Sequence, residues 1–364
     1  MHPGRSGKTK RTDDMFDLTF FEGKKVLLTG HTGFKGSWLS VILANAGAEL
    51  TGYALKPEGE YNLFDISSVE RQMKHIIGDI RDLEHLKSVF IETQPQIVIH
   101  MAAQPIVRES YVNPVYTYET NVMGTVNILE CVRINPCVKS FLNVTTDKVY
   151  ENKEWEWGYR ENEPLDGFDP YSNSKSCSEL VTHCYKNSFF SEGQTSISTA
   201  RAGNVIGGGD FAKDRIIPDC VRSAIKKEDI AVRNPYSTRP YQHVLEPLFA
   251  YLIITSRQYE NSHYSGWYNV GPNDYDCFQT GALVDLFMKH WGNDLKWTSK
   301  YDGGPHEANY LKLDCTKFKN TFNWSPKWNL DKAVNKVVEW SKCWISGGNI
   351  RDCMDRQIKE YLEG

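Results

Sequence analysis

Residues 25–38 read KVLLTGHTGFKGSW, and this stretch decides the fold class of the 364-residue chain. It opens with a short apolar run at 25–30, which is typical of a buried parallel strand. Gly30, Gly33 and Gly36 follow the spacing G-x-x-G-x-x-G. Glycines in such a loop let the backbone approach a pyrophosphate, and the next helix points its N–H groups at the phosphates. An ordinary tight turn is the alternative, but the strand before the loop and the helix after it favour a dinucleotide site.

Strands and helices keep alternating along the chain after this loop. Further strands are expected at 49–54, 75–78, 97–101, 140–144, 196–201 and 267–271. Helices are expected at 83–92, 115–136, 243–257 and from Pro170 onward. This alternation predicts an α/β fold with a doubly wound, Rossmann-type parallel sheet.

The length of the chain predicts about two lobes. Beyond residue 205 the alternation loosens, and Gly207–Gly209 among polar neighbours suggests an excursion away from the sheet. We therefore expect a Rossmann domain and a smaller C-terminal lobe. The expected boundaries are a flexible tail at 1–19, the Rossmann domain at 20–205 plus 243–275, and the smaller lobe at 206–242 plus 276–364.

The composition argues against several classes of function. Hydrophobic residues make up 40% and charged residues 24% of the chain, as in a soluble globular protein. The net charge of -4 gives no basis for binding nucleic acid or a membrane surface, and no apolar run reaches the length of a membrane span. The polar, basic N-terminal segment has no secretory h-region. Nine scattered cysteines without metal-binding spacing predict reduced thiols, no metal and a cytoplasmic location.

The segment after the second strand leaves the choice of cofactor open. An acidic residue commonly binds the adenosine ribose at this place, but residues 53–57 read YALKP. Lys56 would suit a phosphate, so these residues do not decide between NAD and NADP. Asp79 and Ile80, after the third strand, are candidate adenine contacts, and the alternative for Asp79 is a helix cap.

The helix expected from Pro170 carries a tyrosine and a lysine one turn apart. Asp169 can cap this helix, and Pro170 suits its first turn. Tyr171 and Lys175 form the only Tyr-x-x-x-Lys match in the sequence, and on a helix they share one face. A nearby ammonium lowers the pKa of a phenol from about 10, so we predict that Tyr171 acts as a base. The motif is weak by itself, and its position after the fifth strand is what favours this role.

An acid and a base stand side by side after the fifth strand. Residues 144–150 read VTTDKVY, with Asp147 and Lys148 at the centre. Because they come just before the helix of Tyr171, they are candidates for a general acid and a general base. The alternative is a solvated ion pair at a strand end, which is common and almost neutral in energy.

These residues together resemble the extended short-chain dehydrogenase/reductase family. The resemblance spans roughly residues 22–340 and rests on the glycine loop at 30–36, Ala102 and Ala103 after the fourth strand, Asn121, Thr146–Lys148, and the pair Tyr171 and Lys175. Six longer runs are more narrowly similar to the CDP-glucose 4,6-dehydratase family: GHTGFKGSW (30–38), HMAAQPIVRESY (100–111), TTDKVY (145–150), YSNSK (171–175), RAGNVIGGGDF (201–211) and RPYQHVLEP (239–247).

The resemblance implies a tightly held NAD that is reduced and reoxidised within one turnover, which favours NAD over NADP. It also implies that a homodimer or homotetramer converts CDP-glucose to CDP-4-keto-6-deoxyglucose, which feeds deoxysugar synthesis for lipopolysaccharide and O-antigen. The residues that the resemblance assigns to the cofactor are Gly30, Thr32, Gly33, Phe34, Gly36, Asp79, Ile80, Ala102, Ala103, Asn121, Tyr171 and Lys175.

The implied reaction gives each polar residue a role. Tyr171, tuned by Lys175, takes the proton of the 4-hydroxyl as hydride leaves C4, and Thr146 holds that oxygen. Asp147 protonates the departing C6 hydroxyl, and Lys148 removes the C5 proton, where the similar dTDP-glucose dehydratases have an Asp-Glu pair. Both roles need shifted pKa values, because free Asp is ionised and free Lys is protonated at pH 7. Burial favours the required shifts and the mutual attraction of the two charges opposes them, so the sequence leaves the outcome open.

The substrate side needs cations, and arginine forks suit phosphate oxygens. Arg233 is explained equally well as a surface residue, Asn204 has a turn-forming role as its alternative, and a His-Glu pair such as that at His306 is more often a surface feature. The residues that we assign to the nucleotide sugar are Gln104, Asn204, Arg215, Arg239 and His306.

Two other classes of function remain open. One is another nucleotide-sugar 4,6-dehydratase or a 4-epimerase of the same fold, and an epimerase has no need of an acid and a base for C5 and C6. The other is a catalytically silent NAD-binding sensor, which would usually lack Tyr171 or Lys175. The pair Asp147 and Lys148 therefore favours a dehydratase.

Overall fold

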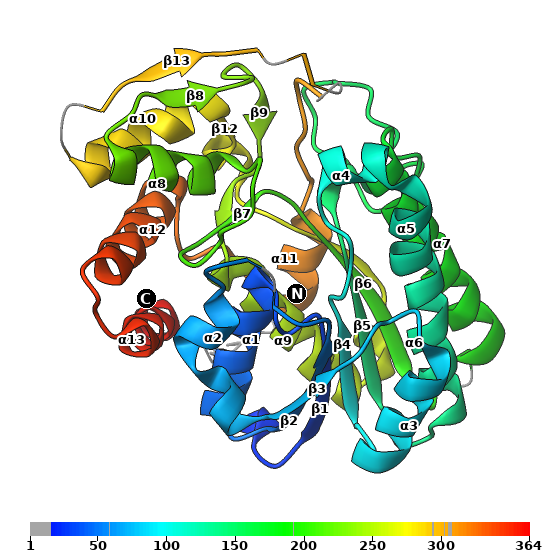
Figure 1. The fold of residues 1–364 in the computed structure, drawn as a ribbon. Helices are drawn as coiled ribbons and strands as arrows, with labels where there is room; N and C mark the ends of the chain where they lie inside the picture. The colour runs from blue at the N-terminus through cyan, green and yellow to red at the C-terminus, as the bar shows by residue number, and fades with distance from the viewer. Residues whose placement is uncertain (1–15, 58, 192, 293–294, 302, 305–307) are drawn as a thin grey trace, which may run out of the picture.

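The computed structural model describes residues 16–364 except 58, 192, 293–294, 302 and 305–307. Its centre is a seven-stranded sheet with strand order β11-β6-β5-β4-β1-β2-β3 (Figure 1). All neighbouring strands of this sheet run parallel. The predicted Rossmann-type α/β fold is confirmed, and every predicted strand lies within one residue of its expected bounds. The strands are β1 (Lys25–Thr29), β2 (Glu49–Ala54), β3 (Lys74–Ile77), β4 (Ile97–His100), β5 (Ser140–Thr145), β6 (Ser196–Ala202) and β11 (Trp267–Val270).

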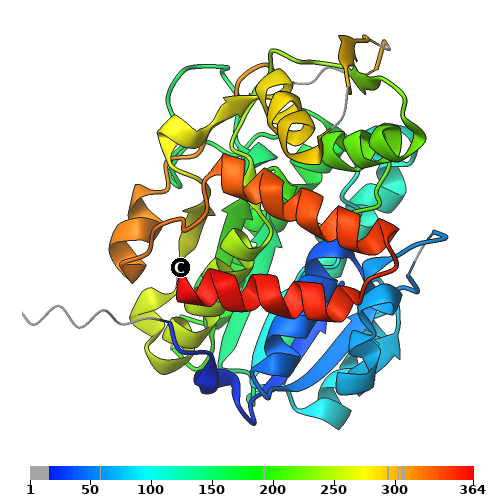
Figure 2. The same cartoon turned by 90° about the vertical axis from the view of Figure 1, so that its left-hand side faces the viewer.

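Helices cover both faces of the sheet (Figures 1 and 2). On one face, a hydrophobic cluster joins the sheet to α3 (Leu83–Thr93), α6 (Gly124–Ile134) and α7 (Pro170–Phe189). On the other face, a larger cluster joins it to α1 (Phe34–Asn45), α9 (Leu245–Glu260) and α13 (Ile350–Glu363). Because helices cover both faces, β5 and β6 are buried at every residue, as expected for central parallel strands.

A smaller lobe packs around its own hydrophobic cluster beyond the carboxyl ends of the strands (Figure 1). Its main elements are α8 (Ile216–Lys226), β8 (Ile230–Val232), α10 (Thr280–Trp291), β13 (Trp297–Ser299) and α12 (Leu330–Ile345). Short strand pairs lead into it: β7 (Val205–Ile206) with β10 (Gln242–His243), and β9 (Thr238–Arg239) with β12 (Phe278–Gln279). Ligands of doubly wound sheets bind outside the carboxyl ends of the strands, so this lobe stands where a substrate would be enclosed.

The helix predicted at 115–136 is a helical run with an irregular turn inside it. It consists of α5 (Pro114–Tyr118), the π-helical turn η3 (Glu119–Met123) and α6. Turns of this kind often occur at functional sites, and this one carries Asn121. The remaining elements are η1 (Leu18–Phe21), α2 (Leu63–Ser67), η2 (Val69–Gln72), α4 (Val107–Val112), η4 (Asp147–Val149), η5 (Ser262–Tyr264), η6 (Asp274–Asp276) and α11 (Thr316–Phe322).

The domain boundaries remain a prediction, and packing at the two ends of the chain refines them. Residues 1–15 of the predicted tail lie outside the described residues, but Phe16 and Leu18 pack against the main core, so the tail does not extend to residue 19. The last helix, α13, packs on the sheet side, where Tyr361 stacks on Phe249 of α9 with ring centroids 4.8 Å apart. Within the described part of the chain, no helix is both long and apolar enough to cross a membrane.

Candidate active site

The glycine loop leads from β1 into α1 as predicted. Gly33 is the N-cap residue of α1. A Cβ added at Gly36 would lie 2.1 Å from the carbonyl oxygen of Gly30, so only glycine lets the helix begin this close to the strand. Thr32 donates a hydrogen bond from Oγ1 to the carbonyl oxygen of Leu55, just after β2, at 3.0 Å. The loop therefore forms a wall of the adjoining cavity largely from its backbone.

A cavity of about 230 Å³ lies beside this loop. Arg81 donates hydrogen bonds to both carboxylate oxygens of Asp79 at 2.7–3.1 Å, and these bonds lower the pKa of Asp79. Asp79 is therefore ionised at neutral pH and can accept hydrogen bonds from hydroxyl groups. Nine of the residues that we assigned to the cofactor line this cavity: Gly30, Thr32, Gly33, Phe34, Gly36, Asp79, Ile80, Ala102 and Ala103.

Two other assigned residues, Asn121 and Gln104, lie behind the cavities. Asn121 accepts a hydrogen bond from the backbone N–H of Gln104 at 2.8 Å and donates one to Ser174 Oγ at 2.9 Å. The side-chain amide of Gln104 donates to Thr117 Oγ1 at 2.9 Å and to the carbonyl oxygen of Ile106 at 3.1 Å. We expected Gln104 to contact the substrate; its amide is held by the preceding bonds to Thr117 of α5 and to Ile106, and Gln104 is not among the described residues that line the second cavity introduced below.

The predicted acid lies where β5 ends. Thr146 donates a hydrogen bond from Oγ1 to Asp147 Oδ1 at 3.0 Å. The Asp147 side chain is buried, and burial raises its pKa although Lys148, Thr146 and Arg239 act to lower it. The direction that a general acid requires is therefore present at Asp147. Lys148 follows Asp147 directly, and both residues line a second cavity, which is described below.

Gly203 and Asn204, which follow β6, contact the second oxygen of the Asp147 carboxylate, Oδ2. A Cβ at Gly203 would lie 1.9 Å from Asp147 Oδ2, so a larger residue would displace this oxygen. Asn204 donates a hydrogen bond from Nδ2 to the same oxygen at 3.2 Å. Asn204 also lines the second cavity described below, and its predicted contact with the substrate stays a prediction.

Tyr171 and Lys175 occupy the first turns of α7, which begins at Pro170 and is capped by Asp169 as predicted. Lys175 is buried and donates a hydrogen bond from Nζ to the carbonyl oxygen of Val144 on β5 at 3.2 Å. Burial, and then the charge of Lys35, lower the pKa of Lys175 to about 7. This hydrogen bond joins α7 to β5 one helical turn from Tyr171, the predicted base.

The pKa of Tyr171 departs from our expectation. We predicted a pKa below the usual value, but burial raises the pKa of Tyr171 to about 12. A hydrogen bond with Thr146 and the charge of Arg215 act to lower it, and the charge of Asp147 adds to the rise. The phenol is therefore protonated at neutral pH, because burial outweighs the nearby cation.

A second cavity, of about 300 Å³, adjoins the first one and shares Phe34, Lys35, Pro105 and Arg215 with it. Among the described residues that line it are seven lysines and arginines and three aspartates, and this excess of cations suits a diphosphate. The structure brings these predicted residues together around it: Thr146, Asp147, Lys148, Tyr171, Asn204, Arg215 and Arg239.

The cations of this cavity are held in place by carboxylates. Arg215 donates a hydrogen bond to Asp210 at 3.0 Å. Arg233 donates one to Asp214 Oδ1 at 2.7 Å, and Arg108 Nε lies 4.0 Å from the same oxygen. We name Arg108, Asp214 and Arg233 the mouth cluster, because these three partly exposed residues join the two lobes at the cavity.

Two further substrate assignments concern the loop that contacts Arg239. Arg239 donates hydrogen bonds to the carbonyl oxygen of Thr238, at 2.9 Å, and to that of Ala308. It is buried and lines the cavity as predicted. The predicted substrate contact His306 lies outside the described residues.

Comparison with known proteins places the chain among nucleotide-sugar dehydratases. A family model described as GDP-mannose 4,6 dehydratase matches residues 27–337. The chain belongs to this family. The chain is also similar to the CDP-glucose 4,6-dehydratase of Salmonella typhimurium, with 48% identity over 354 residues that cover 96% of this chain and 99% of that protein. The expected membership of the extended short-chain dehydrogenase/reductase family is confirmed.

Solved structures of more distant proteins share the fold of this dehydratase family member. The dTDP-glucose 4,6-dehydratase of Bacillus anthracis in complex with NAD has a TM-score of 0.73 and 21% identity, covering 88% of this chain and 97% of that one. The UDP-glucose 4-epimerase of Thermotoga maritima with UDP-glucose has a TM-score of 0.76 and 20% identity, covering 88% and 99%. At such identities the likeness concerns the fold alone.

Lys35 is the main residue of this dehydratase site that our sequence analysis missed. It lines both cavities, and burial, followed by the charge of Arg215, lowers its pKa to about 8. A charge between two glycines of the loop, in GFKG, was the available signal. Arg108 also escaped notice, although it lies within a run that carried the resemblance. Among the described residues, no group of three His, Cys, Asp or Glu side chains could hold a metal ion.

Proposed function

We propose that this chain converts CDP-glucose into CDP-4-keto-6-deoxyglucose with NAD as its cofactor. The observation that carries the proposal is the 48% identity to the Salmonella typhimurium CDP-glucose 4,6-dehydratase over nearly the whole of both chains. The Lys148 side chain beside Asp147 supports it, because a 4-epimerase has no elimination step that would need this acid and base.

The first cavity fits a dinucleotide. Gly33, the N-cap residue of α1, has no side chain, so a pyrophosphate could approach the backbone at the start of this helix. Asp79 offers an ionised acceptor for hydroxyl groups. When bound, NAD supplies a hydride acceptor and a positive charge.

In the proposed reaction, Tyr171 accepts the proton of the sugar 4-hydroxyl, and Thr146 donates a hydrogen bond to the same oxygen. The phenol has a pKa of about 12, so it needs further positive charge before it can act as a base at neutral pH. The hydrogen bond with Thr146 and the charge of Arg215 already act in this direction. Lys175, one turn further along α7, can supply such a charge. Its pKa of about 7 lets both protonation states exist near neutral pH.

Asp147 and Lys148 divide the elimination between them. Burial raises the pKa of Asp147, so its carboxyl group can hold the proton that the departing C6 hydroxyl needs. Lys148, in its neutral form, would take the C5 proton, which the ketone at C4 acidifies. Arg215, Arg239 and Arg233 would bind the diphosphate, because arginine forks match phosphate oxygens.

The test of the proposed function is an end-point assay with four nucleotide sugars. The purified protein with NAD is incubated with CDP-glucose, dTDP-glucose, UDP-glucose or GDP-mannose, and a 4-keto-6-deoxy product is read from its absorbance in alkali. We expect product with CDP-glucose at the highest rate. Faster turnover of another nucleotide sugar would keep the chemistry and overturn the substrate, and no product with any of the four would overturn the function.

A variant separates the two halves of the reaction. Lys148→Ala should remove the C5 base, so exchange of the C5 proton with deuterated solvent should stop together with product formation. Lys153→Ala removes an exposed lysine just beyond the same segment and is the matched control. Exchange at the wild-type rate in Lys148→Ala would contradict the assignment of the base.

We also propose that the protein is a homodimer or homotetramer assembled through the helices beside the active site. Exposed apolar side chains on these helices support this: Val115 on α5 is 71% exposed, Leu180 on α7 54%, and Met123 in η3 50%. Light scattering on the eluting protein would test it, and a monomer would contradict it. The same proposal places the reaction in the cytoplasm, as a source of precursors for O-antigen deoxysugars.

A further inference from the structure

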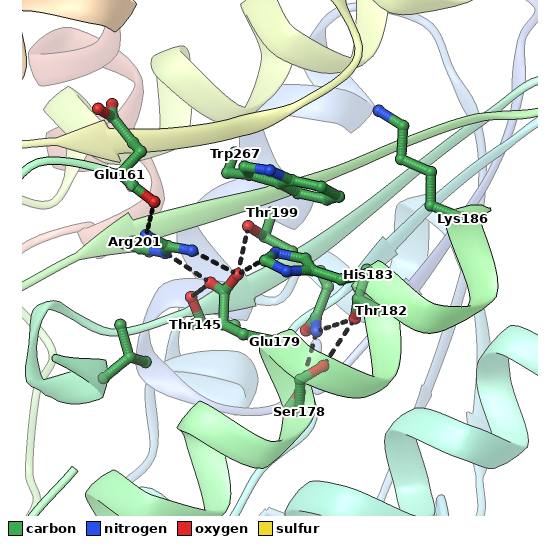
Figure 3. A network of polar contacts seen from close by, with 12 residues as sticks. Thr145, Glu161, Ser178, Glu179, Thr182, His183, Lys186, Thr199, Arg201 and Trp267 are labelled. Atoms are coloured by element: carbon green, nitrogen blue, oxygen red, sulfur yellow. Dashed lines mark hydrogen bonds and ion pairs between the residues drawn. The ribbon is translucent and has the colours of Figure 1, made fainter. Parts of the chain in front are cut away.

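A buried carboxylate, that of Glu179, contacts Thr145, the residue just before the segment Thr146–Lys148, which we name the catalytic segment (Figure 3). Glu179 follows Lys175 by one turn of α7, and its side chain is fully buried. Its Oε1 accepts a hydrogen bond from Thr145 Oγ1 at 2.5 Å, and its Oε2 accepts one from Thr199 Oγ1 at 2.7 Å. Arg201 on β6 donates to both oxygens, from Nε and NH2, each at 3.0 Å. This one side chain thus joins α7, β5 and β6.

Arg201 extends the same network to the other side of the catalytic segment. Its NH1 donates hydrogen bonds to Tyr150 Oη at 2.8 Å and to the carbonyl oxygen of Glu161 at 3.1 Å. Tyr150 Oη in turn donates to Asn269 Oδ1 on β11 at 2.6 Å. The guanidinium also lies over the Tyr150 ring, 5.1 Å from its centroid.

The two contacts bracket the residues that would perform the elimination. Thr145 comes immediately before Thr146–Lys148, and Tyr150 follows it after one intervening residue, Val149. The segment itself is only a short 3-10 turn, η4. We propose that Glu179 and Arg201 are positioning residues, which fix both ends of this turn and thereby set where Asp147 and Lys148 stand relative to the sugar. This inference rests on the proposed function, because it concerns the acid and base of that reaction.

The pair is better explained by positioning than by stability alone. Replacing a buried ion pair with apolar residues of similar volume is often neutral or stabilising, so such a pair is weak evidence for a gain in stability. The pair can have a large effect on the position of the catalytic groups. A misplacement of about 1 Å can cost about 100-fold in rate. The network adds contacts from three strands and one helix at both ends of a turn that is itself only three residues long.

The sharpest test uses two threonines that contact the same carboxylate. Thr145→Val and Thr199→Val each remove one hydroxyl that donates to Glu179, and both side chains are buried. Only Thr145 adjoins the catalytic segment. We expect Thr145→Val to lower kcat by about 10-fold or more with KM changed less than about two-fold, and Thr199→Val to keep kcat within about two-fold of the wild type. Equal losses of kcat in the two variants, or a wild-type kcat in Thr145→Val, would overturn the proposal.

A second pair of variants tests the other end of the turn. Tyr150→Phe removes the hydroxyl that Arg201 holds, whereas Tyr159→Phe removes one from the ring stacked on Tyr150, with centroids 5.2 Å apart. Hydrogen exchange of the peptide 144–151 in the protein without substrate is the readout, so the result does not depend on turnover. We expect faster exchange in Tyr150→Phe than in Tyr159→Phe. Unchanged exchange in Tyr150→Phe would overturn the positioning role.

The outcomes also separate this inference from the proposed function. Glu179→Gln removes the charge of the central carboxylate and is the most direct variant, but it can fail to fold because Arg201 would lose its buried partner. The hydroxyl variants leave the ion pair intact and avoid that problem. If the wild-type protein turns over no nucleotide sugar, the proposed function fails, while the exchange experiment still decides whether the network holds the turn.

Discussion

Two carboxylate–arginine groups use the same chemistry in opposite environments: the buried pair Glu179 and Arg201, which we name the floor pair and which lies behind the lining of the second cavity, and the mouth cluster, which lines it. In the floor pair, the side chains of Glu179 and Arg201 are both 0% exposed (Figure 3). In the mouth cluster, Asp214 is 40% exposed, with Arg233 at 25% and Arg108 at 31%. A buried pair cannot exchange partners without a large desolvation cost, whereas an exposed one exchanges easily. The floor pair is therefore suited to fixing geometry, and the mouth cluster to releasing its arginines to a substrate.

The electrostatics of the buried pair and of the mouth cluster also differ. Burial acts to raise the pKa of Glu179, but the charge of Arg201 and hydrogen bonds from His183, Arg201 and Thr145 outweigh it and hold the pKa well below its usual value. Glu179 thus stays ionised at any pH at which the enzyme would work. The mouth cluster has cations in excess, so a diphosphate can compete with Asp214 for them.

The largest effect should come from Tyr171, the proposed base, which lines the second cavity. Tyr171→Phe removes the group that accepts the proton of the 4-hydroxyl, and loss of such a group typically costs about 10²- to 10⁴-fold. We expect this loss in kcat with little change in KM, measured by initial rates with CDP-glucose. Tyr185→Phe, on the same helix α7 but outside both cavities, is the control. A kcat within about ten-fold of the wild type in Tyr171→Phe would exclude Tyr171 as the essential base.

Breaking the floor pair should have the largest effect on stability. Arg201→Met leaves Glu179 as a buried charge without its main partner, which typically costs about 3–5 kcal/mol. Urea unfolding at neutral pH measures this cost. Arg222→Met removes an arginine that pairs with Asp219 on α8, where both side chains are about one-third exposed, and it should cost less than about 1 kcal/mol. Similar costs for the two variants would show that burial does not distinguish these pairs.

The floor pair also predicts a pH dependence. The pKa of Glu179 is lower in the folded protein than in the unfolded chain, where it is about 4.3. The stability contributed by this carboxylate is therefore present above about pH 4.3 and is lost as the pH falls below it. Unfolding free energies measured between neutral and acidic pH should show a steeper acid loss in the wild type than in Arg201→Met. Parallel pH profiles would mean that Arg201 does not hold the pKa of Glu179 down.

The fold could be predicted from local signals, and parts of the site could not. Each strand is a short apolar run bounded by turn residues, and the glycine loop and Asp169 mark the starts of α1 and α7 in the sequence itself. The grouping of Thr146–Lys148 with Tyr171 also follows from topology, because the carboxyl ends of parallel strands lie at one edge. The side-chain direction of Gln104 does not follow from topology, since it depends on hydrogen bonds to Thr117 and Ile106.

Two features of the site, the pKa of Tyr171 and the network around Glu179, depend on burial and packing that the sequence does not show. The pKa of Tyr171 rises because its surroundings exclude water, and spacing to Lys175 says nothing about that. The network joins Thr145, Tyr150, Glu179 and Arg201, which come from separate elements, and no spacing in the sequence links them. Only the packing of α7 against β5 and β6 brings them together.

A middle-sized effect is expected where the two cavities meet. Arg215 lines both cavities and holds Asp210, so Arg215→Gln removes one of the cations that would bind the diphosphate. A hydrogen bond to a charged group contributes about 1.5–3 kcal/mol, so KM for CDP-glucose should rise about 10-fold or more. Initial-rate kinetics measure it, with Arg133→Met, on α6 and outside both cavities, as the control. An unchanged KM would remove Arg215 from the substrate site.

The smallest effect should come from the mouth cluster. Asp214 has a left-handed backbone, with φ of 62°, and asparagine tolerates this conformation, so Asp214→Asn changes the charge with little strain. Exposed pairs contribute about 0–1 kcal/mol, and we expect the unfolding free energy to change by less than about 0.5 kcal/mol. Because the substrate would no longer compete with Asp214 for Arg233 and Arg108, KM should fall by about two- to five-fold at low salt.

The salt dependence of this last variant shows whether the mouth works by exchange of partners. Asp214 and a diphosphate compete electrostatically for partly exposed arginines, and salt screens such interactions. The difference in KM between Asp214→Asn and the wild type should therefore shrink as salt is raised. Asp219→Asn removes the same charge from a similarly exposed pair on α8, and it should leave KM unchanged at both salt concentrations. If Asp214→Asn instead raised KM, the carboxylate would hold the arginines in place for the substrate, and the mouth cluster would fix geometry as the floor pair does.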